Sequence, residues 1–210
     1  MQVSWENLIA HIRGCTACPL HEGRTCAVPG EGNLSARLMF IGEGPGKQED
    51  LQGRPFVGPA GQLLTQMIRA IGLERKDVYI ANIVKCRPPF NRAPTREEAE
   101  ACLPYLRAQV ALLRPRILVA LGATAARHII DASVRITLDH GVWTRKGAFW
   151  LIPTFHPAAL LRDPEKKKAA WEDFKTIRDK LNDLDAHPER ETKEDGREKK
   201  EVRQAQERMF

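Results

Sequence analysis

The sequence predicts an α/β fold: a three-layer sandwich with a central four-stranded parallel sheet flanked by helices. Three observations lead to this prediction. Short apolar runs end in Gly, Pro or polar residues, segments with helical periodicity follow them, and the two kinds of segment alternate along the 210-residue chain. Such alternation is typical of a parallel sheet with helices on both faces.

The predicted strands are four apolar runs bounded by turn residues. They span residues 38–41, 77–84, 117–122 and 149–153. Because the carboxyl ends of parallel strands meet at one edge of the sheet, the loops after these runs should form a common ligand-binding edge.

The predicted helices follow from apolar positions three and four residues apart. They span residues 5–12, 61–71, 95–113, 124–130 and 164–184, and Thr95 with Glu98 forms a capping box at the start of the third. After His187 almost no residue is apolar. We therefore expect one globular domain over residues 1–184 and a charged tail over residues 185–210, disordered or a frayed solvated helix.

The composition is basic, with 33 Lys and Arg against 27 Asp and Glu. A basic domain suits a polyanionic partner, although charge also serves solubility. No stretch approaches 18 uninterrupted apolar residues, so no membrane span is expected. The first residues lack a signal-peptide layout, so the expected compartment is the cytoplasm, where cysteines are ligands or free thiols rather than disulfides.

Several polar residues interrupt the apolar pattern near strand ends. Glu43 is the only charged residue in the turn Gly42–Gly46, where it is either a chemical group or a solvated carboxylate of a tight turn. Asn82 interrupts a buried strand and needs hydrogen-bond partners from the backbone or from a ligand.

Phe56, between Pro55 and Gly58, is either an anchor under its loop or a stacking surface. The Cys15-x-x-Cys18 turn suits a metal or a redox disulfide.

Taken together, Gly42–Gly46, Asn82, Lys85–Pro89 and His156–Arg162 resemble the motifs of the family 4 uracil-DNA glycosylases. The resemblance runs from about Cys15 to Leu181. It implies an enzyme that rotates deoxyuridine out of DNA and hydrolyses its N-glycosidic bond, which releases uracil and leaves an abasic site for base excision repair.

The resemblance also implies the roles of the site residues. His156 would donate a hydrogen bond to uracil O2, Asn82 would read the Watson–Crick edge, and Phe56 would stack on the base. Gly42 and Gly44 would form the wall of a narrow uracil slot. Activation of the attacking water stays open among Glu43, Glu49 and Asn91. The implied DNA contacts are Lys85, Arg87, Arg92, Leu160, Leu161 and Arg162, with one of the two leucines filling the gap left by the flipped base.

Four cysteines match the layout of the family: Cys15, Cys18, Cys86 and Cys102. Four thiolates fit zinc or a [4Fe–4S] cluster; the single close pair and the resemblance favour the cluster, in a structural role. Cys26 is left without a ligand role. No nucleotide cofactor is expected, because both the phosphate-loop and the dinucleotide patterns fail at the glycine turn.

The resemblance leaves two other classes of function to test. One is a non-catalytic or covalent uracil-DNA binding module, and the other is an accessory protein associated with a DNA polymerase. We expect a monomer that acts on single- or double-stranded uracil-containing DNA.

Overall fold

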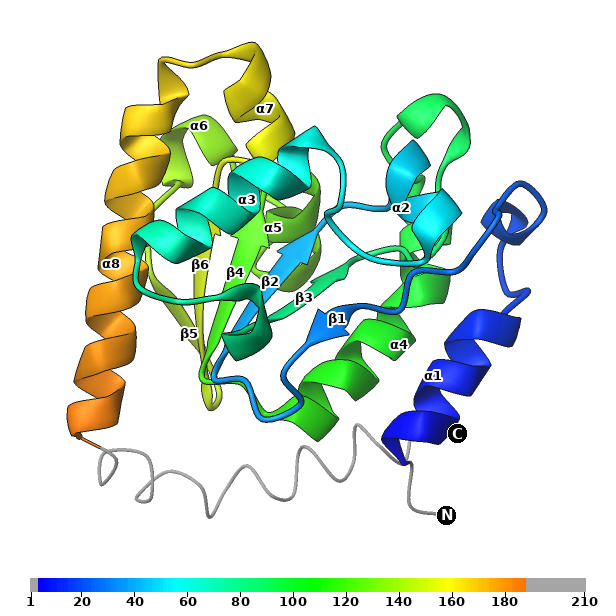
Figure 1. The fold of residues 1–210 in the computed structure, drawn as a ribbon, viewed down its shortest axis with the longest axis horizontal. Coiled ribbons are helices and arrows are strands. Elements are labelled where there is room, and N and C mark those ends of the chain that lie inside the picture. The colour runs from blue at the N-terminus through cyan, green and yellow to red at the C-terminus, as the bar shows by residue number, and fades with distance from the viewer. Residues whose placement is uncertain (1–3, 188–210) are drawn as a thin grey trace.

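The computed structural model describes residues 4–187 and consists of a twisted sheet between two layers of helices (Figure 1). The strands are β1 (Glu31–Gly32), β2 (Leu38–Gly42), β3 (Tyr79–Asn82), β4 (Ile117–Leu121), β5 (Thr144–Lys146) and β6 (Phe149–Thr154). The helices are α1 (Trp5–Gly14), α2 (Lys47–Gln52), α3 (Pro59–Ala70), α4 (Arg96–Leu113), α5 (Ala123–Ile129), α6 (Ile136–Asp139), α7 (Pro157–Arg162) and α8 (Lys166–Ala186), with 3-10 turns η1 (Pro19–His21), η2 (Arg75–Asp77) and η3 (Pro89–Asn91). The expected tail lies outside the described residues from residue 188 onward.

The α/β class is confirmed, but the sheet has six strands rather than four, in the order β1-β3-β2-β4-β6-β5. The four predicted strands form its parallel centre, and β1 and β5 add antiparallel edges. The edge strands contain two and three residues and are partly exposed. Strands this short and polar produce no apolar run, which is why the sequence did not reveal them.

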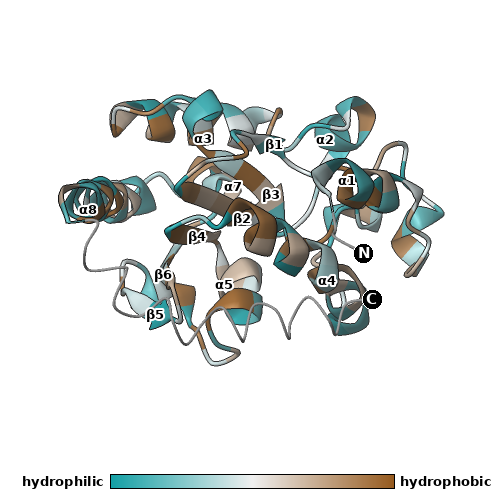
Figure 2. Ribbon diagram, turned by 90° about the horizontal axis from the view of Figure 1, so that it is seen from below, coloured by the Kyte–Doolittle hydropathy of each residue, from teal (hydrophilic) through white to brown (hydrophobic). Residues whose placement is uncertain are grey.

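Alternate residues of the central strands pack against different helical layers. Met39 and Ile41 of β2 face α4 and α5, whereas Leu38 and Phe40 face α3 and α8. Figure 2 shows the predominantly apolar central strands enclosed between helices of mixed hydropathy. This two-sided burial explains the uninterrupted apolar runs of the parallel strands.

The register of the sheet aligns the ends of the parallel strands. Gly42 pairs with Asn82, and Leu121 pairs with Thr154. The loops that follow β2, β3, β4 and β6 therefore open at one edge, as expected for ligand sites in this fold class.

The segment after β6, expected to be one of the loops at the ligand-binding edge, begins instead with helix α7. Pro157 occupies its first turn, and the side chain of His156 caps it by accepting a hydrogen bond from the Ala158 amide. Proline is well suited to the first helical turn because it lacks an amide hydrogen. Elsewhere in residues 4–187, no helix is both long enough and apolar enough to cross a membrane.

Candidate active site

Gly42 allows two side chains to close over the end of β2. A Cβ added at Gly42 would lie 2.5 Å from Asn82 Oδ1 and 2.5 Å from Phe56 Cζ. Any larger residue would therefore displace one of them. Gly44 is similarly restricted, since its added Cβ would lie 2.8 Å from Val84 Cγ2.

Asn82 carries a buried acceptor that no protein group satisfies. Its side chain is 1 % exposed, and within residues 4–187 its Oδ1 is the one buried side-chain nitrogen or oxygen atom without a hydrogen-bond partner. Buried polar atoms nearly always have partners, because an unpaired one costs about 1–3 kcal/mol. An acceptor left unpaired at the ligand edge of the sheet is suited to an N–H donor of a ligand.

Phe56 has a strained backbone that its neighbours hold in place. Its φ is +52°, in the left-handed region that residues with a Cβ seldom adopt. The Arg75 guanidinium donates to the carbonyls of Phe56 and Pro55 at 3.1 and 2.8 Å. Strain that the surrounding structure maintains is a mark of functional sites. No local motif around Arg75 indicated this role in the sequence.

His156 faces Phe56, with ring centroids 5.6 Å apart and an angle of 31° between the planes. The Ala158 amide donates to His156 Nδ1 at 3.1 Å, so the ring proton resides on Nε2. Burial and the positive charge of Arg162 lower the pKa of His156 to about 4, while Glu49 acts in the opposite direction. The imidazole is therefore a neutral N–H donor at physiological pH.

Gly122 makes room for this histidine. Its φ is +89°, and an added Cβ would lie 2.9 Å from His156 Cβ. A side chain here would both strain the backbone and push the imidazole away from Phe56. Glycine thus allows the turn after β4 to pack directly against the start of α7.

Of the three candidates for activating the water, Glu49 and Glu43 are held by hydrogen bonds at the ligand edge of the sheet. Glu49 Oε1 accepts hydrogen bonds from the Val57 and Gly58 amides, both at 2.9 Å. The Glu43 carboxylate accepts a hydrogen bond from the Thr124 hydroxyl. Glu49 is thereby tied to the loop that carries Phe56, and its charge acts on His156.

Asn91 lies in the exposed loop between β3 and α4. Its Oδ1 accepts from Arg87 Nε at 2.8 Å, and Arg92 forms a two-pronged ion pair with Glu98 at 2.7 and 2.6 Å. Phe90, which lies between Arg87 and Arg92 in the chain, is 99 % exposed and has a φ of +54°. The loop therefore presents an exposed aromatic ring beside arginines that are held by hydrogen bonds and an ion pair. The sequence did not indicate this feature.

Two residues expected to contact DNA are buried. Lys85 is 1 % exposed, and its ammonium donates to the Asn82 carbonyl at 2.9 Å and to Gln109 Oε1 at 2.7 Å. Leu160 is 1 % exposed and packs in an apolar cluster with Phe155 and Ala170. The prediction of DNA contacts by these two side chains is wrong, because packing inside the fold removes them from the surface.

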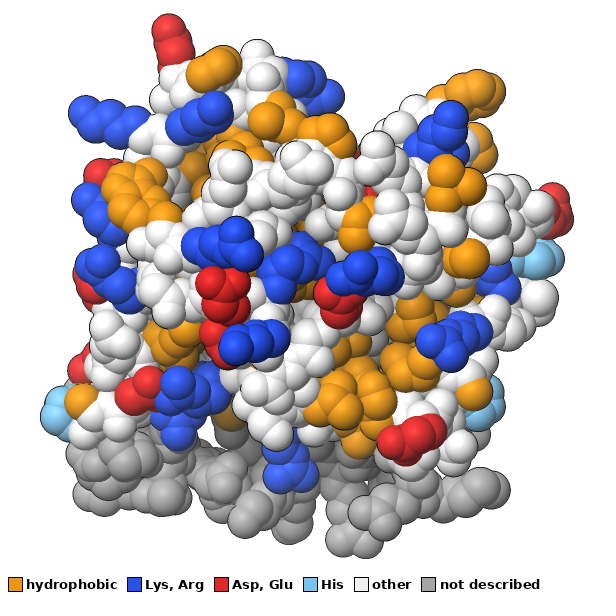
Figure 3. All heavy atoms as spheres, viewed as in Figure 1, with side chains coloured by type: hydrophobic (Ala, Val, Ile, Leu, Met, Phe, Trp, Pro, Cys, Tyr) orange, Lys and Arg blue, Asp and Glu red, His pale blue; other side chains and the backbone are white. Residues whose placement is uncertain are grey.

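Their sequence neighbours remain accessible. Leu161 is 45 % exposed, and Arg162 is also exposed at the end of α7. Figure 3 shows hydrophobic and basic side chains together along the upper edge of the molecule, over α7 on one side and over the loop before α4 on the other. The ligand edge of the sheet lies between these two projections in Figure 1.

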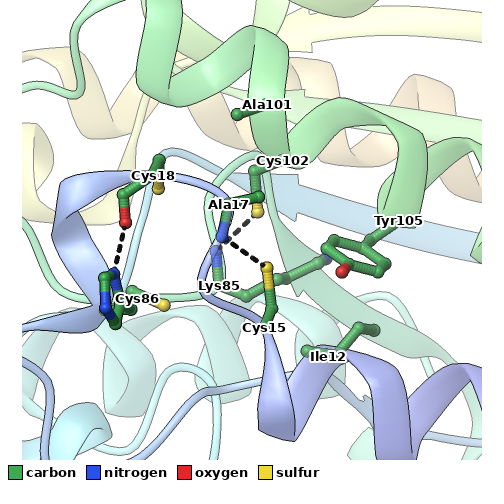
Figure 4. A pocket seen from close by; sticks show the side chains of 10 residues that line it. Ile12, Cys15, Ala17, Cys18, Lys85, Cys86, Ala101, Cys102 and Tyr105 are labelled. Atoms are coloured by element: carbon green, nitrogen blue, oxygen red, sulfur yellow. Dashed lines mark hydrogen bonds between the residues drawn. The ribbon is translucent and has the colours of Figure 1, made fainter.

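The four predicted ligand cysteines line a single cavity between the Cys-x-x-Cys turn, the loop after β3 and α4 (Figure 4). The other residues that line it are Ile12, Ala17, His21, Lys85, Ala101 and Tyr105. Burial raises the pKa of Cys102 to about 11 and that of Cys86 above its usual value. Cys26 does not line this cavity, and its backbone amide donates to Asp50 Oδ1 at 3.4 Å.

Several N–H groups point at the cysteine sulfurs. Arg24 donates to Cys86 Sγ at 3.2 Å, and the Lys85 amide donates to Cys102 Sγ at 3.3 Å. Within residues 4–187, no three His, Cys, Asp or Glu side chains come together tightly enough to hold a single metal ion. Four thiol groups that share one cavity, two of them accepting hydrogen bonds from Arg24 and from the Lys85 amide, are the type of donor set that holds a metal–sulfur group.

The sequence of the chain is similar to those of known proteins. Residues 29–175 match the family model described as the uracil DNA glycosylase superfamily. The chain is 54 % identical over 156 residues to the type-4 uracil-DNA glycosylase of Thermotoga maritima, across 72 % of this chain and 80 % of that protein. It is 47 % identical over 185 residues to the type-4 uracil-DNA glycosylase of Sulfurisphaera tokodaii, across 84 % of each chain. A similar relative from Archaeoglobus fulgidus is 44 % identical over 184 residues, across 83 % of this chain and 92 % of that protein.

Proposed function

The chain belongs to the type-4 uracil-DNA glycosylases of the uracil-DNA glycosylase superfamily, and on this premise we propose how its residues remove uracil. It is a DNA repair hydrolase that cleaves the N-glycosidic bond of deoxyuridine and releases uracil. The observation that carries the proposed mechanism is the unpaired buried Oδ1 of Asn82 beside Phe56. Deoxyuridine reaches this edge by rotating out of the DNA stack.

Asn82 reads the flipped base. Its Oδ1 accepts a hydrogen bond from uracil N3–H, and its amide nitrogen donates to uracil O4. Cytosine reverses this pattern of donor and acceptor, so it leaves the buried amide unsatisfied. Phe56 stacks on the ring, which supports any planar base and leaves the choice of base to Asn82.

His156 stabilises the leaving group. Negative charge develops on uracil as the glycosidic bond breaks, and Nε2–H of the neutral imidazole donates to O2 where this charge grows. The hydrogen bond from the Ala158 amide holds the ring in the tautomer that this role requires.

Glu49 is the proposed group for the attacking water and for the cation-like sugar. Its Oε1 is fixed by two backbone amides, and its Oε2 lies beside Gly46, where an added Cβ would sit 2.8 Å away. Glu43 instead lines the slot through its bond with Thr124. The exposed Asn91 is the least suited of the three, because its side-chain oxygen is engaged by Arg87.

One experiment tests the activity and separates it from the alternative functions. The protein is incubated with uracil-containing single- and double-stranded DNA, and we expect free uracil and an alkali-labile abasic site. A covalent binding module would instead shift the DNA on a denaturing gel, and an accessory protein would leave the DNA intact. Sedimentation of the same sample tests the proposed monomer.

The depressed pKa of His156 predicts an unusual pH profile. The group works as the neutral form, which persists down to a pH near its pKa of about 4. The single-turnover rate of uracil release should therefore show no loss centred on the ordinary histidine pKa of about 6.5 and should fall only as the pH approaches 4. A rate that halves near pH 6.5 would contradict the role. The free energy of unfolding should decline as the pH falls from about 6.5 to about 4. In this range the histidine binds a proton in the unfolded chain but not in the folded protein.

The proposed DNA-facing surface consists of Leu161 and Arg162 on α7 and of Arg87, Phe90 and Arg92 in the loop before α4. These side chains are at least partly exposed at both ends of the ligand edge. The arginines meet phosphates, and Leu161 fills the space left by the flipped nucleotide. The exposed ring of Phe90 is available to stack on a neighbouring base.

Leu161 and Leu160 form a matched pair for testing this surface. Leu161→Ala should slow uracil release from duplex DNA roughly tenfold with little change in Tm, because only the filled gap is lost. Leu160→Ala should lower the free energy of unfolding by about 2–5 kcal/mol, because it opens a cavity in the core. Single-turnover rates and thermal melts measure the two effects. Equal losses of stability in both variants would contradict the assignment.

The four cysteines are the proposed ligands of a structural [4Fe–4S] cluster. When bound, such a cluster cross-links the N-terminal segment, the loop after β3 and α4 through its Fe–S bonds. The uracil chemistry itself uses the protein side chains described above.

The cluster assignment predicts a brown protein with about four iron atoms per chain and absorbance at about 400 nm. Cys102→Ala should lose most of this iron and lower Tm. Cys26→Ala is the matched control and should retain both. A colourless wild-type protein with one equivalent of zinc would contradict the assignment.

A further inference from the structure

Lys85 lies between the base-reading edge and the cysteine cavity. It follows Asn82 by three residues and directly precedes Cys86. Its backbone amide donates to Cys102 Sγ at 3.3 Å, and its side chain lines the cavity that the four cysteines share (Figure 4). This residue therefore contacts both functional regions.

The ammonium of Lys85 is held by a buried hydrogen-bond network. It donates to the backbone carbonyl of Asn82 at 2.9 Å and to Gln109 Oε1 at 2.7 Å. The amide nitrogen of Gln109 donates in turn to the Pro29 carbonyl at 2.8 Å and to the Tyr79 hydroxyl at 3.3 Å. The network fixes the orientation of Gln109 and, through the ammonium, the backbone at the end of β3.

Both acceptors of this ammonium are uncharged. A fully buried cation needs compensating negative charge as well as hydrogen bonds, because removing it from water is energetically unfavourable. The thiolates that hold a metal–sulfur group would supply that charge directly beside Lys85.

We propose that Lys85 is a positioning residue that couples the cysteine-held group to base reading, by fixing the Asn82 carbonyl while the neighbouring thiolates stabilise its buried ammonium. The inference rests on the proposed roles of Asn82 and of the four cysteines. It assigns the metal–sulfur group an effect on the uracil site that passes through one side chain. A small displacement of Asn82 then lowers the rate, because the base must be held in a reactive geometry.

A double-mutant cycle distinguishes positioning from general support of the core. Lys85→Met keeps the unbranched side chain out to Cε and removes the ammonium with its charge and hydrogen bonds. We expect it to slow single-turnover uracil release by about 10–100-fold in the wild-type background. In the Asn82→Ala background the same change should cost less than about threefold, because the group that Lys85 positions is already gone.

The outcomes of the cycle are distinct. An equal loss in both backgrounds, or no loss in either, would overturn the positioning role. If Asn82→Ala alone leaves uracil release unchanged, the proposed reading by Asn82 fails, and the inference about Lys85 fails with it. Lys76→Met, at an exposed lysine of η2, is the matched control and should behave as wild type. If Lys85→Met does not fold, Gln109→Met removes one acceptor of the ammonium and should show the same dependence on the background.

A second readout does not depend on activity. Iron loss from the purified holoprotein to a chelator can be followed by absorbance at about 400 nm. Lys85→Met should lose iron several-fold faster than wild type and Lys76→Met, because a cation beside the thiolates is removed. Equal rates of iron loss would overturn the coupling to the cysteine site.

Discussion

Replacing His156 with Ala should lower the single-turnover rate of uracil release by about 10²–10³-fold, the usual cost of removing one hydrogen-bond donor from a developing anion. The donor acts mainly in the transition state, so binding of uracil-containing DNA should change little. The ring of His156 lies against that of Phe56, and its Nδ1 already accepts from the Ala158 amide, which leaves Nε2–H for the base.

The control for this prediction is His11→Ala, at an exposed histidine of α1 that should leave the rate unchanged. Quenched-flow or manual sampling with enzyme in excess isolates the chemical step from product release. A His156→Ala rate within threefold of wild type would reject the proposed role.

Replacing Asn82 with Asp should change which base is released. A carboxylate at this buried position accepts hydrogen bonds but cannot donate to uracil O4, so uracil release should fall roughly 100-fold. The same carboxylate can accept from the amino group of cytosine, so cytosine release should become detectable. The effect is expected to be large because the wild-type Asn82 Oδ1 has no partner inside the protein, and the amide is therefore free to be used by the base.

Release of labelled uracil and cytosine from matched oligonucleotides measures this change in selectivity. Asn33→Asp, at an exposed turn residue, is the matched control for the chemical change. An Asn82→Asp enzyme with wild-type preference for uracil would show that another group reads the base.

The two leucines of α7 show why neighbouring residues cannot be separated from the sequence alone. Leu160 and Leu161 are identical in type and adjacent, and both were expected at the DNA. The helix turns successive side chains by about 100°, so Leu160 enters the core while Leu161 stays at the surface. The direction in which a side chain points depends on the residue at which the helix begins. The cap formed by His156 sets the start of α7 at Pro157.

Lys85 shows a second limit of sequence reasoning. A lysine in a basic, proline-rich loop suggests a phosphate contact, and its burial becomes visible only once Gln109 and the Asn82 carbonyl are placed around it. These partners are 24 and three residues away in the chain, and no local pattern links them. For the same reason, Arg75 beneath Phe56 was not foreseen.

The sequence by itself determined the α/β class, the four parallel strands, most of the helices and the family. These follow from local periodicity, from Gly and Pro at the ends of elements, and from short motifs whose order along the chain is specific. Tertiary structure alone decided the edge strands and the burial of Lys85 and Leu160. It also revealed the unpaired oxygen of Asn82 and the hydrogen bond from Arg75 to the Phe56 carbonyl. The physical reason is that burial and hydrogen bonding depend on residues brought together from distant parts of the chain.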